Sequence, residues 1–129
     1  MIIRQPKIDD SVQLYQLYQA EGWKSFTPDK IEQLLQTSCW FVLEVEGEIC
    51  GFVRYLTDGV LTTYLCELLV SKKHRHKGYA SLLLTELGHH HPKTRLDLVS
   101  EADDFYEHLQ FRIIGTGMRK LISTDLSQK

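Results

Sequence analysis

An apolar run that ends at Val70 is followed at once by a basic turn, and a glycine in that turn opens a segment with helical spacing. The turn reads Ser-Lys-Lys-His-Arg-His-Lys-Gly-Tyr-Ala over residues 71–80. A strand, a glycine-containing turn and a helix N-terminus form an anion site, because unpaired backbone N–H groups and the positive end of the helix dipole converge there. Four Lys/Arg side chains in residues 72–77 indicate a phosphate-bearing anion.

The charge of the chain is unevenly distributed. Residues 72–77 carry +4, which leaves −6 for the remainder (11 Lys/Arg against 17 Asp/Glu) and a net charge of −2. A basic spot on an acidic body favours a small polyanion over a broad footprint on nucleic acid, so we expect no nucleic-acid partner. A length of 129 residues with 43% hydrophobic residues predicts one domain over residues 1–129.

Three cysteines, at positions 39, 50 and 66, form an odd set without CxxC spacing, and each sits in an apolar, strand-like stretch. Such thiols usually behave as small buried hydrophobic groups, which predicts a reducing, cytoplasmic setting. No apolar run approaches the ~20 residues of a membrane span, and Met1–Arg4 is too short for a signal peptide. We therefore expect no membrane partner.

Hydrophobic periodicity predicts four helices among several strands. The helices are expected to begin after the Asp9-Asp10-Ser11 cap, at Pro28 behind the Thr27 cap, at Ala80, and at a Ser100 capping box, with Gly88 ending the third. Strands are expected at residues 1–4, 40–45, 49–56, 61–70, 95–99, 111–114 and 118–122. The order βααβββαβαββ predicts an α/β fold in which a mixed sheet carries helices on both faces.

Two motifs on this element order resemble the GNAT superfamily of acyl-CoA-dependent N-acetyltransferases. Residues 75–80, Arg-His-Lys-Gly-Tyr-Ala, match the family signature Arg/Gln-x-x-Gly-x-Gly/Ala in a strand-to-helix context. Residues 105–111 match a family Phe-Tyr pair on the last helix, followed by a step into the next strand. Gln110 stands where the family usually has glycine, which predicts a less tight turn. Leu17-Tyr18, Gly22-Trp23 and Asp58-Gly59 also recur in a bacterial GNAT subgroup, so the resemblance covers nearly the whole chain.

The resemblance implies a mostly antiparallel central sheet of about seven strands and acetyl-CoA as the acyl donor, with no metal. It implies direct transfer of the acetyl group to a primary amine of an unidentified acceptor. The pyrophosphate would rest on Arg75, His76, Lys77, Gly78, Tyr79 and Ala80. Backbone groups of Leu68, Leu69 and Val70 would hold the pantetheine arm like an added strand.

The resemblance also implies two catalytic residues. Tyr106 matches the family position that protonates the leaving thiolate, although it also completes a core stripe. Glu67, in an apolar strand on the same face as Leu65 and Leu69, matches the position of a base that takes the amine proton. The alternative for Glu67 is a structural ion pair, for example with Arg54 on the neighbouring strand.

Trp23 and Phe26, in a loop that borders the acceptor site in this fold, are candidates for acceptor binding together with Arg54. Core packing is an equal alternative for the two aromatic residues. His89-His90-His91 is not expected to bind metal, because consecutive side chains diverge and no Cys or carboxylate has ligand spacing.

The main alternative function is a non-catalytic CoA-binding module that senses or regulates. It would use the same turn but would not need Glu67 or Tyr106. The sequence leaves the acceptor open between a small-molecule and a peptide amine. It leaves the oligomeric state open too, although homodimers are common in the family.

Overall fold

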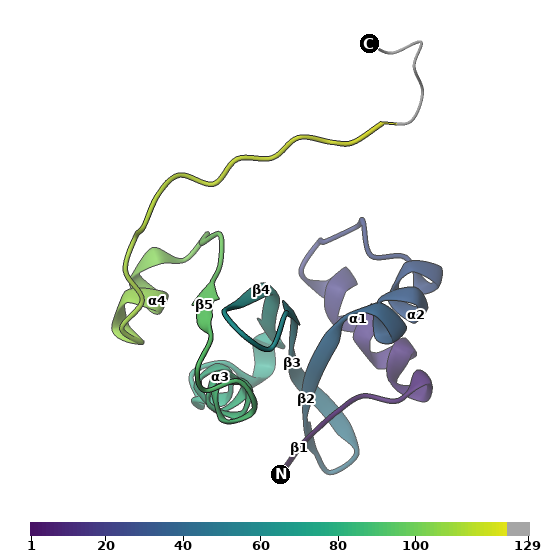
Figure 1. The fold of residues 1–129 in the computed structure, drawn as a ribbon. Coiled ribbons are helices and arrows are strands. Elements are labelled where there is room, and N and C mark those ends of the chain that lie inside the picture. Colours follow the sequence, from purple (N-terminus) through teal and green to yellow (C-terminus); the bar gives the residue numbers. More distant parts are fainter. Residues whose placement is uncertain (124–129) are drawn as a thin grey trace. The chain divides into compact units, whose positions relative to one another are not determined.

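The computed structural model describes residues 1–123 of the chain (Figure 1). The chain divides into two compact units, residues 1–98 and the part from residue 99 onward. The expectation of a single domain over residues 1–129 stays a prediction. Within the described residues, no helix combines the length and the apolar character that crossing a membrane requires.

The first unit is built on a mixed sheet that is mostly antiparallel. Neighbouring strands β1 to β4 pair antiparallel, and β5 joins β4 in parallel. Over residues 1–123 the sheet has five strands in the order β1-β2-β3-β4-β5, so the expectation of about seven is wrong. The strands are β1 (Ile2–Arg4), β2 (Cys39–Val45), β3 (Glu48–Thr57), β4 (Thr62–Val70) and β5 (Arg95–Asp97).

The two missing strands are those expected at residues 111–114 and 118–122. These residues form no strand, and their apolar side chains are largely exposed, as at Ile113 (71%) and Met118 (95%). A strand exists only where a partner completes its ladder of hydrogen bonds. No ladder pairs these segments with any other described residue, so an apolar pattern alone did not make them strands.

Helices cover both faces of the sheet, as predicted. Helices α1 (Ser11–Ala20) and α2 (Pro28–Thr37) share one apolar core with the sheet, and α3 (Tyr79–His90) lies in the other (Figure 1). Short 3₁₀ turns, η1 (Ile8–Asp10) and η2 (Lys72–His74), precede α1 and α3. Helix α3 runs through Gly88 to His90, so the expected stop at Gly88 is wrong. An exposed glycine weakens a helix without breaking it.

The side chains of β2 contribute to both apolar cores, one on each face of the sheet. Trp40 and Val42 pack with α1 and α2, whereas Phe41 and Leu43 pack with α3. Side chains alternate between faces along a strand, so a strand buried on both sides appears in the sequence as a continuous apolar run.

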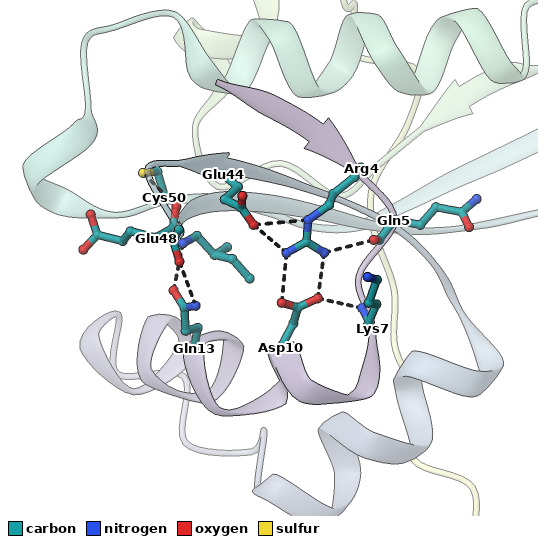
Figure 2. A network of polar contacts seen from close by, with 10 residues as sticks. Arg4, Gln5, Lys7, Asp10, Gln13, Glu44, Glu48 and Cys50 are labelled. Atoms are coloured by element: carbon teal, nitrogen blue, oxygen red, sulfur yellow. Dashed lines mark hydrogen bonds and ion pairs between the residues drawn. The ribbon is translucent and has the colours of Figure 1, made fainter.

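A polar network fixes the N-terminus of the first unit (Figure 2). The Arg4 guanidinium donates to Asp10 Oδ2 at 2.8 Å and Oδ1 at 3.0 Å, and to Glu44 Oε1 at 2.8 Å. Asp10 also accepts from the backbone N–H of Lys7 at 2.6 Å. The Asp10 carboxylate, expected to cap α1, is therefore bound to Arg4, and Arg4 joins β1, η1 and β2. The Arg4 guanidinium lowers the pKa of Asp10.

Candidate active site

A largely buried ion pair joins β3 and β4 in the first unit. Arg54 lies directly opposite Glu67 in the strand register. Its Nε donates to Glu67 Oε1 and its Nη2 donates to Oε2, both at 2.6 Å. The two side chains are only 12% and 11% exposed. This is the Arg54–Glu67 ion pair considered from the sequence as the alternative for Glu67. Because each partner is fixed on a strand of the same sheet, the bidentate contact has a defined geometry.

Tyr18 and Ser38 extend the pair into a network. The hydroxyl of Tyr18, on α1, donates to Glu67 Oε1 at 2.7 Å, and Arg54 Nη1 donates to Ser38 Oγ at 2.9 Å. Burial, followed by the negative charge of Glu67, raises the pKa of Tyr18 far above its usual value, so its hydroxyl remains a donor. Glu67 Oε1 accepts two hydrogen bonds and Oε2 accepts one. Because each oxygen has two lone pairs, one acceptor position remains, on Oε2.

A β-bulge sets the direction of the Glu67 side chain. The register shifts next to Arg54, and Cys66 is the extra residue on β4. Leu69 therefore packs in the core of α1 and α2, whereas Leu65 packs in the core of α3. The expectation that Glu67 shares a face with both leucines is wrong for Leu65, because a bulge reverses the alternation beyond it.

Trp23 and Phe26 lie against the ring of Tyr18. Phe26 stacks on it with ring centroids 4.0 Å apart, and Trp23 is tilted at 6.2 Å. Both are partly buried against the core of α1 and α2, so the core packing considered from the sequence is present. Acceptor binding by these two residues stays a prediction. The ring they surround carries the hydroxyl that contacts Glu67.

The basic turn adopts a backbone that only a few residue types favour. Gly78 precedes α3 with φ +78°, and His76 has φ +65°. A Cβ on Gly78 would meet no protein atom within 4 Å. The glycine is therefore required for its left-handed conformation, and the space beside it is open.

The N-terminus of α3 has no protein cap. No side chain accepts from its first turn, and that turn carries no acidic residue. Its first intrahelical bond runs from Leu82 N to the Gly78 carbonyl. The backbone N–H groups of residues 79–81 thus have no acceptor among the described residues, which leaves the positive end of a three-turn helix available to an anion.

Two of the four Lys/Arg side chains in the basic turn contact groups outside the turn. Lys73 Nζ lies 2.7 Å from Glu48 Oε1. Arg75 contacts Glu21 through Nη2 and donates from Nε to the Val70 carbonyl at 3.1 Å. Arg75 therefore anchors the turn to the end of β4 as well as carrying charge.

Lys72 and Lys77 are the other two cations. Both are exposed, and neither forms an ion pair within residues 1–123. With the open helix N-terminus they make up the part of the predicted anion site whose charge no carboxylate neutralises.

One edge of β4 is open along most of its length. Pairing with β5 covers only Thr62–Tyr64. The stretch Leu65–Val70 has no β5 partner in the described part of the chain, and this stretch contains Leu68, Leu69 and Val70. An open strand edge offers backbone donors and acceptors to an extended, amide-bearing ligand.

Tyr106 belongs to the second unit, in α4 (Asp103–His108). It is half-buried, with Phe105 and Phe111 edge-on at 5.0 and 5.4 Å. Burial raises the pKa of its phenol, so it is protonated at neutral pH and is able to donate. The structure thus brings Tyr18, Arg54 and Glu67 together in the first unit. Tyr106, the second candidate catalytic residue, lies in the second unit.

The turn after α4 shows how the Gln110 departure is accommodated. Gln110 takes φ +71°, the left-handed conformation that a glycine adopts freely. At the N-terminal end of α4, the expectation that Ser100 is the N-cap is wrong. Ala102 does, and Ser100 Oγ accepts from its backbone N–H at 3.1 Å.

Sequence reasoning missed the contacts of Tyr18, Ser38 and Glu21. The spacing of Tyr18 fits the apolar stripe of α1 and by itself indicates only core packing. No local pattern indicates that its hydroxyl reaches a carboxylate 49 residues away. A tyrosine on an otherwise aliphatic stripe was the one available signal, since a buried hydroxyl needs a partner.

Comparison with known proteins supports one family. A family model described as acetyltransferase (GNAT) domain matches residues 36–113, more than half of the chain. The chain therefore belongs to the GNAT acetyltransferase family. No curated protein matches its sequence.

Solved structures share the fold at low sequence identity. A GNAT-family acetyltransferase of Streptococcus pneumoniae has a TM-score of 0.78 at 23% identity, with 94% of this chain and 96% of that one covered. PaiA N-acetyltransferase of Thermoplasma acidophilum, in complex with coenzyme A, has a TM-score of 0.74 at 16% identity, covering 90% and 92%. Ribosomal-protein-alanine N-acetyltransferase of Brucella melitensis has a TM-score of 0.69 at 18% identity, covering 95% and 97%.

Proposed function

We propose that this protein transfers an acetyl group from acetyl-CoA to a primary amine by direct attack. The observation that carries the proposal is the uncapped N-terminus of α3, which directly follows β4 and the basic turn. A phosphate group there would satisfy the free N–H groups of residues 79–81 and would neutralise Lys72 and Lys77.

The residues of the first unit fit the rest of acetyl-CoA. The open edge at Leu68–Val70 suits the amides of the pantetheine arm, which would run along β4 as an added strand. The open space beside Gly78 suits the close approach of a pyrophosphate. Arg75, His76, Lys77, Tyr79 and Ala80 complete the proposed cradle.

An amine that arrives protonated first releases one proton to solvent, since only the neutral amine has a lone pair for attack. From the neutral amine, the proposed reaction requires one proton to be removed and one to be supplied. The amine nitrogen forms a bond to the thioester carbonyl carbon, the carbon–sulfur bond breaks, and the electron pair leaves on sulfur. Glu67 would take the amine proton at Oε2, directly or through a water, because only that oxygen has a lone pair left. Tyr106 would give its hydroxyl proton to the thiolate.

A cationic acceptor suits the charge of the protein. Outside residues 72–77 the chain carries −6, which attracts an amine in its protonated form by long-range steering. We propose Trp23, Phe26 and Arg54 as neighbours of the acceptor, since all three adjoin the Tyr18–Glu67 contact. The acceptor would be a small-molecule or peptide amine.

The test combines binding and turnover. Calorimetric titration should show acetyl-CoA binding to the folded protein, and a thiol-release assay over a panel of amines should show amine-dependent CoA formation. No binding at millimolar acetyl-CoA contradicts the proposal. Binding without turnover on any amine supports the alternative, a non-catalytic CoA-binding module.

A further inference from the structure

Three side chains that are able to bind a metal lie together where β3 meets the basic turn. Glu48 and Cys50 start β3, and His74 ends η2. One carboxylate oxygen, the thiol sulfur and one imidazole nitrogen all lie within 4.8 Å of one another. The family resemblance implied no metal, and no sequence pattern joined His74 to Cys50, which lie 24 residues apart. Antiparallel pairing of β3 with β4 brings them together.

The imidazole is already oriented toward Glu48. His74 Nδ1 lies 2.6 Å from Ser71 Oγ, and Nε2 lies 3.5 Å from Glu48 Oε2. A metal-binding histidine characteristically uses one nitrogen for the metal and bonds the other to a supporting group, which fixes the ring. Tyr79 also lies against the ring, with centroids 6.3 Å apart and planes 28° from parallel.

The backbone holds the cluster together. The Ser71 N–H donates to the Cys50 carbonyl at 2.8 Å, so the element that carries His74 is tied to the strand that carries the thiol. In a tetrahedral zinc site the ligand atoms are about 3.3–3.7 Å apart, given bonds of about 2.0–2.3 Å. The 3.5 Å between Nε2 and Oε2 meets this spacing, and the three ligand atoms together lie within 4.8 Å of one another.

Charge at the cluster allows a divalent ion. Glu48 uses Oε1 for Lys73 and turns Oε2 toward His74, so one oxygen remains for a metal. Lys73 is 68% exposed and is able to move away from an incoming cation. Metal binding would release the Cys50 thiol proton to solvent, because the thiolate is the form that binds metal.

We propose that Glu48, Cys50 and His74 form a site for a borderline-soft divalent transition-metal ion of the Zn²⁺ type. A thiolate and an imidazole prefer such ions to Mg²⁺ or Ca²⁺, which take oxygen ligands. Three protein ligands leave a fourth position for water. The bound ion would connect the start of β3 to η2 in the basic turn. Figure 2 shows Glu48 and Cys50 at the start of β3. This site does not depend on the proposed acetyl transfer.

The experiment is a Co²⁺ titration of the reduced full chain followed by absorption spectroscopy. Co²⁺ replaces Zn²⁺ in tetrahedral sites, and a cobalt–thiolate bond gives a near-ultraviolet charge-transfer band. We expect the band to saturate at one equivalent and to disappear when Zn²⁺ is added. Absence of the band in the folded wild-type protein overturns the proposal.

Matched variants identify the ligands. Cys50→Ser should abolish the band, while Cys39→Ser, at an exposed cysteine outside the cluster, should retain it. His74→Gln should weaken Co²⁺ binding at least about tenfold, and it covers the case in which Cys50→Ser fails to fold. Full band intensity in Cys50→Ser, unchanged affinity in His74→Gln, or loss of the band in Cys39→Ser contradicts the assignment.

Discussion

At the scale of single residues, Glu67 combines a structural and a proposed chemical role. Arg54 and Tyr18 occupy three of its four lone-pair positions, which fixes the carboxylate and leaves one position on Oε2. An ion pair and a base are therefore compatible in this geometry. The two roles predict different consequences of substitution.

Glu67→Gln tests these roles. We expect the free energy of unfolding to fall by roughly 3 kcal/mol, because the Arg54 guanidinium is left largely buried without its counter-charge. If Glu67 is also the base, kcat/KM should fall at least about tenfold under conditions where the variant is folded. Urea unfolding and steady-state kinetics measure the two effects.

Tyr18→Phe is the matched control for Glu67→Gln. It removes one hydrogen bond to Oε1 and leaves the carboxylate and Arg54 in place, so we expect a stability loss of roughly 1.5 kcal/mol and a smaller loss of turnover. If Glu67→Gln destabilised the protein but kept full turnover, Glu67 would be a structural ion-pair partner only.

Tyr106→Phe tests the proposed acid. Phenylalanine keeps the ring that packs against Phe105 and Phe111 and removes the hydroxyl. We expect kcat to fall at least about tenfold while the Kd of acetyl-CoA and the unfolding midpoint hardly change. Unchanged kcat for the folded variant would contradict the assignment of Tyr106.

At the scale of elements, α3 and the turn before it matter most. The helix begins at a left-handed glycine, lacks a cap, and continues past a second glycine near its end. Gly78 and Gly88 thus have different physical roles within one element, and they provide a paired test.

Gly78→Ala and Gly88→Ala should have opposite effects on stability. A Cβ at Gly78 costs about 1–2 kcal/mol, because an L-residue resists φ +78°. Gly88→Ala should stabilise by about 0.5–1 kcal/mol, because alanine favours the helix and its Cβ would meet nothing within 4 Å. Urea midpoints measure both changes.

The two substitutions should also differ in their effect on acetyl-CoA binding. We expect Gly78→Ala to weaken binding and Gly88→Ala to leave the Kd unchanged, since only the first lies in the proposed cradle. Equal affinities in both variants would show that the cofactor does not use this turn.

The sequence predicted those elements whose partners are close along the chain. The apolar spacing of α1 and α2 and the runs of β2 to β4 were sufficient, because each buries its own apolar face. The bulge at Cys66 was not predictable, since residues 64–69 form an apolar run around Glu67 and nothing in it marks an extra residue. The expected strands at 111–114 and 118–122 show the same limit, because a strand needs a partner that its own residues do not specify.

The candidate site was predicted in part for a similar reason. Adjacent strands made the Arg54–Glu67 pair a reasonable expectation, and the structure shows it. The Tyr18 contact depends on how α1 packs across the sheet. A long-range hydrogen bond of this kind has no local signature.

At the scale of the whole molecule, carboxylates held by hydrogen bonds control stability in acid. Asp58 accepts from the backbone N–H groups of Val60, Leu61 and Thr62 at 2.8 to 3.0 Å, which lowers its pKa to about 2. Arg4 lowers the pKa of Asp10 in the same direction. A depressed pKa stabilises the fold above the ordinary value of 3.8, and this stabilisation is lost as pH falls through the folded value.

We therefore expect the free energy of unfolding to fall as pH is lowered from about 4 to 2, and Asp58→Asn and Asp10→Asn each to flatten this decline. Asp9→Asn, at an exposed residue with no ion pair in the described part of the chain, is the control and should keep the wild-type slope. Urea titrations at several pH values measure the effect. Wild-type slopes in both test variants would contradict it.

We infer that the basic turn and the N-terminus of α3 bind the pyrophosphate of acetyl-CoA. The most direct measurement compares the Kd of acetyl-CoA with that of acetyl-pantetheine, which carries the same thioester and arm without the phosphates, by calorimetry on the folded protein. We expect acetyl-pantetheine to bind at least about 100-fold more weakly, because about 3 kcal/mol of charge-assisted hydrogen bonds is lost. Equal affinity for the two ligands, or no binding of acetyl-CoA at millimolar concentration, would contradict it.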